Sequence, residues 1–129
     1  MSWKFNSTEA VFVQIARHLR CDIVRGKYKP DEQIPPVRQL AYDAAVNPNT
    51  MQKALALLEN EGLLRSKGTV GRFVTSDTKV LEEAKIRIRH DVVSHWLEEA
   101  RSLGITPKEL IDCINDLKKE ETHDEYTCS

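Results

Sequence analysis

A face of polar side chains without acidic residues occurs between residues 45 and 64, in AVNPNTMQKALALLENEGLL. A helix turns by about 100° per residue, so Asn49, Lys53, Ala56 and Asn60 project together, opposite an apolar side. Asn can pair bidentately with an adenine edge, and Lys can bind guanine or phosphate. The alternative is an ordinary solvated helix face, which usually carries more charge. The spacing favours a helix that reads base edges.

The neighbours of these residues have similar chemistry. Gln52 flanks the polar face and Thr50 lies in the first turn, and both types can bond to base edges. Asn47 is expected to cap the helix, with Pro48 at the first helical position, where the missing N–H costs nothing. Such a helix enters the major groove with its N-terminal residues leading. We therefore expect double-stranded DNA as a partner.

Two further expected helices support this one. The apolar spacing predicts them over residues 9–25 and 36–44. Ser7 or Thr8 is expected to cap the first helix, and Gly62 to stop the base-reading helix.

A short hairpin is expected after these helices. Residues 63–65 and 72–75 read as strands around a turn-rich tip, whereas KYKPDEQI, residues 27–34, reads as a loop. Three helices followed by a hairpin predict a winged helix-turn-helix. The expected fold class is mainly α, with a small β-hairpin wing.

The second part of the chain reads as two amphipathic helices, one over residues 77–103 and one starting at Thr106. Thr106 and Glu109 have the spacing of a capping box. The apolar stripe is too broad for a lone helix to bury, so we expect a two-fold interface between copies of the chain. Its expected residues are Leu81, Ile88, Val92, Trp96, Leu103, Leu110 and Ile114.

Charge is distributed unevenly along the chain. Residues 1–76 carry 11 Lys and Arg against 7 Asp and Glu, and residues 77–129 carry 8 against 13. A basic first part suits a polyanionic partner, and an acidic second part would stay off it. No apolar run reaches the roughly 18 residues of a membrane span, and the N-terminus lacks a signal peptide. We expect a cytoplasmic protein without a membrane partner.

Catalytic and metal-binding patterns find little support in the sequence. No phosphate loop, nucleophile elbow or zinc-protease signature occurs, so we expect no enzyme, catalytic residue or cofactor. His18 and Cys21 are three residues apart and His90 and His95 five apart, which matches no zinc-ligand pattern. These residues are expected to pack or to face solvent, and no metal is expected.

Three stretches between Gln14 and Val74 carry a family resemblance: QIARHLRCDIVRGKYKPDEQIPPVRQLA, VNPNTMQKALALLENEGLL and SKGTVGRFV. In this order they resemble the DNA-binding domain of GntR-type bacterial transcription regulators. The later phrase LGITPKELI is similar to the YtrA-type subgroup, whose small C-terminal region forms homodimers. The resemblance implies a transcription regulator, expected to be a repressor.

The resemblance also implies roles for single residues. Arg38 stands in the family's DNA-contacting motif, here VRQLA. Lys67 and Gly71 fall in the wing, which in this family reaches the minor groove. The turn and early recognition helix supply the remaining implied DNA contacts: Asn47, Asn49, Thr50, Gln52 and Lys53.

This chain departs from the family's pattern at two places. Pro36 stands where the family has a capping Ser, so the helix that follows must begin without a side-chain cap. The family's wing has two glycines around one residue, whereas here Gly68 and Gly71 enclose two residues.

The sequence predicts a winged helix-turn-helix over residues 1–76, a two-helix dimerisation region over 77–120 and a polar, flexible tail over 121–129. The predicted function is operator binding as a homodimer on a pseudo-palindrome. A small-molecule effector, if used, would sit between subunits or against the DNA-binding domain. The alternatives are a winged-helix module that binds protein instead of DNA, and a small metal or ligand sensor.

Overall fold

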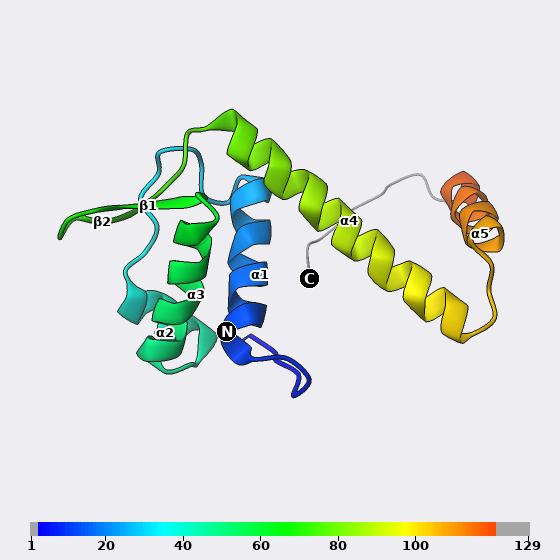
Figure 1. Cartoon of the computed structure of the whole chain (residues 1–129), viewed down its shortest axis with the longest axis horizontal. Helices are drawn as coiled ribbons and strands as arrows, with labels where there is room; N and C mark the ends of the chain where they lie inside the picture. Colours follow the sequence, from blue (N-terminus) through cyan, green and yellow to red (C-terminus); the bar gives the residue numbers. More distant parts are fainter. Residues whose placement is uncertain (1–2, 121–129) are drawn as a thin grey trace. The chain divides into compact units, whose positions relative to one another are not determined.

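A computed structural model describes residues 3–120, and the expected polar tail over 121–129 lies outside them. Five helices and a two-stranded hairpin follow one another along the chain (Figure 1). They are α1 (Val11–Arg25), α2 (Val37–Ala44), α3 (Pro48–Asn60), β1 (Leu64–Lys67), β2 (Gly71–Val74), α4 (Thr78–Ser102) and α5 (Pro107–Glu120).

The chain forms two compact units that divide inside α4, after Lys85. The hairpin ends at Val74, two residues before the expected boundary at residue 76, and the first turns of α4 belong to the first unit. Val80 and Leu81 contact its core, and Ala84 is buried there. The linking helix is therefore anchored at its start.

The core of the first unit lies where α1 and α2 pack against α3 (Figure 1). Its fully buried large side chains come from α1, from α3 and from both ends of the hairpin: Ile15, Met51, Leu55, Leu58, Leu63 and Val74. Burying one such side chain stabilises the fold by about 1.5–3 kcal/mol. The apolar residues that recur at helical spacing in the sequence are thus the residues that form this core.

The start of α1 differs from the expected one. The helix begins at Val11 after Ala10, which has no side-chain acceptor, so the expected caps Ser7 and Thr8 were wrong. The Asn6 side chain accepts bonds from the Thr8 N–H and hydroxyl instead, at 3.0 and 2.7 Å. The Gln14 amide then binds the carbonyls of Asn6 and Glu9, both at 3.0 Å. These bonds hold the segment that precedes α1 against the helix.

The hairpin has the expected antiparallel form, with each strand starting one residue from its expected position. Leu64 pairs with Val74 and Lys67 with Gly71. The segment that was expected to be a loop also joins this sheet at one point, because Gln33 forms a bridge with Phe73. The wing is therefore supported from the segment that precedes α2.

The second unit consists of the rest of α4 and of α5. The expected capping box forms: the Glu109 carboxylate accepts the Thr106 N–H at 2.9 Å, and the Glu109 N–H donates to the Thr106 hydroxyl at 3.2 Å. After Gly104, α5 turns away from α4 instead of folding back along it (Figure 1). None of the described helices is long and apolar enough to cross a membrane.

Candidate nucleic-acid interface

The polar face of α3 lies where the sequence predicts it. Asn49, Lys53, Ala56 and Asn60 are all exposed. The opposite side of α3 is buried in the core and consists of Met51, Ala54, Leu55 and Leu58. Since the apolar side is fully occupied, the exposed side is the one that a partner molecule can meet.

The N-terminal end of α3 is built by Asn47 and Pro48. The Asn47 side-chain oxygen accepts the Asn49 N–H at 2.7 Å, as expected of a cap. Thr50 is half-buried in the first turn, whereas Gln52 is exposed beside the polar face. Asn47 therefore has a structural role in the free protein, whatever it does in a complex.

Lys53 has a neighbour that the sequence did not indicate. Its ammonium lies 5.9 Å from the centroid of the Phe12 ring on α1. A cation at this distance from an aromatic face is weakly attracted to it. The contact joins residues 41 positions apart, so only the packing of α1 beside α3 reveals it.

One side of α2 presents two exposed side chains in adjacent turns. Arg38 is exposed at the second position of the helix, and Tyr42 follows four residues later with 82% of its surface accessible. Residues four apart share one side of a helix. Tyr42 was not among the expected contacts, and its exposure is unusual for so large a side chain.

Two cations near the hairpin are held by carboxylates. Arg72 and the Ser66 hydroxyl both bind the Glu59 carboxylate at the end of α3. Arg65 binds Asp31 at 2.9 Å. These pairs tie the hairpin to the rest of the unit.

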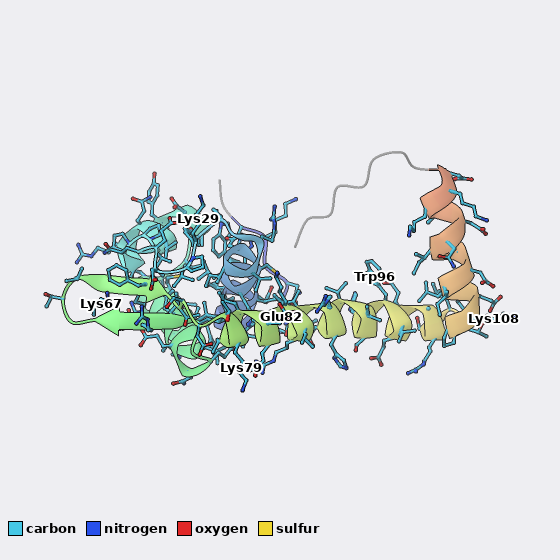
Figure 2. The ribbon with its side chains drawn as sticks, turned by 90° about the horizontal axis from the view of Figure 1, so that it is seen from above. Lys29, Lys67, Lys79, Glu82, Trp96 and Lys108 are labelled. Carbon is cyan, nitrogen blue, oxygen red and sulfur yellow. The ribbon has the colours of Figure 1, made fainter. Side chains whose placement is uncertain are left out.

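Lys67 is placed differently. Its ammonium lies 4.7 Å from the centroid of the Phe73 ring, and Figure 2 shows it on the hairpin. Lys67 is exposed and Gly71 is half-buried. The hairpin thus presents a positive charge beside its tip.

The predicted interface residues fall into two groups. Leu81 packs against the core of the first unit, and Ile88 and Leu110 are half-buried. The other four are exposed: Val92, Trp96, Leu103 and Ile114. Trp96 is 48% accessible and Leu103 71%, and Figure 2 shows Trp96 along α4. Leu81 is already packed against other residues of its own chain, whereas the four exposed residues are not buried.

The histidines do not gather into a ligand set in the described chain. The His18 ring stacks on Trp3 with centroids 3.9 Å apart, and its Nε2 lies 3.6 Å from the Asp22 carboxylate. His90 and His95 are exposed on α4. Among residues 3–120, no three His, Cys, Asp or Glu side chains are placed to share a metal ion.

Comparison with known proteins agrees with this geometry. Residues 12–74 match the profile of the family described as bacterial regulatory proteins, gntR family. The repressor YtrA of Bacillus subtilis is 26% identical over 115 residues, which cover 88% of both chains. A GntR family transcriptional regulator from Listeria monocytogenes has a similar structure, with a TM-score of 0.77 and 27% identity over 87% of this chain and 98% of that one.

A further structure contains DNA. The DNA-binding domain of AraR in complex with the operator ORX1 is similar to this chain with a TM-score of 0.51 and 28% identity. The match covers 56% of this chain and 93% of that domain. In sequence and in structure, the chain belongs to the GntR family of bacterial regulatory proteins.

Proposed function

We propose that this GntR-family regulator binds a pseudo-palindromic operator as a homodimer and represses transcription from it. The observation that carries the proposal is the outer face of α3, which is exposed, polar and free of acidic side chains. It lies within residues 12–74, which match the gntR family profile, and a DNA-binding domain solved on its operator is similar to 56% of this chain. In this proposal α3 enters the major groove and reads base edges through Asn49, Gln52 and Lys53.

Contacts to the DNA backbone surround this helix. Arg38 is exposed at the start of α2 and meets a phosphate, while Thr50 and Asn47 lie at the end of α3 that carries the positive helix dipole. Lys67 and Gly71 lie in the wing and meet the minor groove. Phosphate contacts set the orientation of the protein, and base contacts select the sequence.

In this proposal the homodimer forms through the second unit. The exposed apolar residues of α4 beyond Lys85 and of α5 are not covered within the second unit, because α5 turns away from α4 (Figures 1 and 2). A second copy can cover them through a self-complementary, two-fold contact. This arrangement agrees with a place in the YtrA-type subgroup, and it also gives an effector a site between subunits.

One experiment tests the core of the proposal. Selection of bound duplexes from random DNA should enrich two inverted half-sites separated by about one helical turn or a multiple of it. Absence of any enriched sequence at physiological salt would contradict operator reading. It would favour the alternative of a winged-helix module that binds protein, although the polar face of α3 suits such a module poorly.

A further inference from the structure

The segment that precedes α2 runs beside β2 and pairs with it. The Asp31 N–H donates to the Val74 carbonyl at 2.9 Å, and the Val74 N–H donates to Glu32 at 2.9 Å. One step along, the Ile34 N–H donates to the Arg72 carbonyl at 3.0 Å. These bonds place the side chain of the residue between Glu32 and Ile34 next to the tip of the wing.

That residue is Gln33, and its side chain reaches the tip. Its Nε2 donates to the Val70 carbonyl at 2.8 Å. On the way it passes over Gly71, where an added Cβ would lie 2.7 Å from Nε2. Gly71 has φ +137°, which L residues rarely adopt. The glycine thus leaves space for the Gln33 side chain at the start of β2, directly after the turn.

The bond fixes the turn at the tip of the wing. The Val70 N–H donates to the Lys67 carbonyl at 2.9 Å and closes the turn. The Val70 side chain is 63% accessible, a high value for an apolar residue. With the Val70 carbonyl bound to Gln33, the orientation of the whole turn is set from outside the hairpin.

We infer that Gln33 is a positioning residue for DNA binding. Its hydrogen bond to Val70 holds the wing tip in the orientation at which Lys67 and Val70 meet the minor groove. An ordered wing loses less conformational freedom when it binds, so affinity rises without an added DNA contact. The inference rests on the proposed operator binding by this winged helix-turn-helix.

Two single variants remove the bond in different ways. Gln33→Met keeps the length of the side chain but has no donor, and Gln33→Ala removes the side chain. Each should lower affinity for the operator selected by the wild-type dimer by about two- to tenfold, the range of one hydrogen bond. The dependence of affinity on salt should stay the same, since no charge is lost. The variants should still fold, because Gln33 is exposed and lies outside the core.

A double-variant cycle shows whether Gln33 acts through the tip. Gly71→Ala introduces backbone strain and also displaces the Gln33 amide from Val70. In the wild-type background it should therefore lower affinity more than in the Gln33→Met background, where the bond is already absent. Equal losses in both backgrounds would mean that Gln33 does not act through the wing tip and would overturn the inference.

The outcomes separate this inference from the proposed function. If the wild-type dimer selects no operator, the proposed function fails. If it binds an operator and Gln33→Met binds equally well, the role of Gln33 fails while the proposed function stands. Weaker binding by Gln33→Met, together with a smaller effect of Gly71→Ala in that background, supports the role.

Discussion

At the scale of single residues, the outer face of α3 is distinguished by what its side chains can donate and accept. Asn49 and Gln52 each offer an amide donor and acceptor, and Lys53 offers three donors. Ala56 adds little bulk in the middle of the face, which permits close approach to a groove. Because these side chains are exposed, replacing them should leave the core intact.

Lys53→Ala and Gln52→Ala should each lower affinity for the selected operator by about 1–3 kcal/mol, the value of one good base contact. The thermal unfolding midpoint should not change. Binding can be measured by fluorescence anisotropy with a labelled duplex. Lys108→Ala is a matched control for Lys53, because it removes an exposed positive charge from the start of α5. Equal operator affinity of Lys53→Ala, Gln52→Ala and wild type would contradict the assignment of this face.

Arg38 is expected to act differently, through charge. Arg38→Ala should weaken binding to the operator and to unrelated DNA alike. The slope of log affinity against log salt should become shallower by about 0.9, as expected for one lost phosphate contact. Titrations at several salt concentrations measure this slope. A slope equal to that of the wild type would exclude the phosphate contact.

At the scale of elements, α3 depends on its cap. Asn47 satisfies one N–H of the first turn, and Pro48 removes the need to satisfy another. A DNA-reading helix needs a rigid N-terminal turn, because that turn enters the groove first. Asn47 therefore contributes both to the stability of the fold and to the geometry of the proposed site.

Two variants separate the cap from a DNA contact. Asn47→Ala should lower the free energy of unfolding by about 1 kcal/mol, whereas Asn47→Asp should retain stability because Asp caps equally well. Asn47→Asp should nevertheless weaken operator binding, since it adds a negative charge beside the DNA. Chemical denaturation and anisotropy measure the two effects. Full operator affinity of Asn47→Asp would place Asn47 away from the DNA.

The start of α5 should respond to acid. The Thr106 N–H, and then the Thr106 hydroxyl, bond to Glu109 and lower the pKa of its carboxyl. A lowered pKa in the folded state means that the stabilisation is present above the unfolded pKa, about 4.3, and is lost as pH falls through the folded value. The first turn of α5 should therefore fray in acid.

NMR chemical shifts of residues 106–110 can follow this change between neutral and acid pH. Glu109→Gln should remove the dependence on pH, because its amide oxygen accepts the same bond at every pH. Identical acid fraying in the wild type and in Glu109→Gln would assign the effect to another group.

At the scale of the whole molecule, the two units differ in how far they bury their apolar residues. The first unit has a core of its own, whereas α5 buries no residue and α4 exposes apolar residues beyond Lys85. Isolated helices with such faces gain little stability in water. A second copy of the chain would supply the missing cover and would bring a second α3 to the DNA.

Trp96→Asp should therefore give monomers in sedimentation velocity experiments. Because one recognition helix reads only half of the operator, affinity for the full operator should fall by at least tenfold. Ser94→Asp is the matched control: it adds the same charge on another side of α4 and should leave the dimer intact. A dimer that survives Trp96→Asp would move the interface elsewhere.

Much of the fold could be predicted from the sequence because helices and caps depend on residues close together in the chain. The spacing of Met51, Leu55 and Leu58, the Asn47 cap and the Thr106–Glu109 capping box all act over a few positions. The exposed face of α3 followed directly from the same periodicity. A family resemblance carried by motifs of fixed spacing could be recognised for the same reason.

Only the tertiary structure decided contacts between residues far apart in the chain. Gln14 binds the Asn6 carbonyl, Leu81 packs against its own unit, and Gln33 reaches the wing tip. Each contact depends on how elements pack against one another, and no periodicity or local motif records that packing. The residue types and their order determined the helices and the exposed face of α3, and the packing decided which distant side chains contact one another.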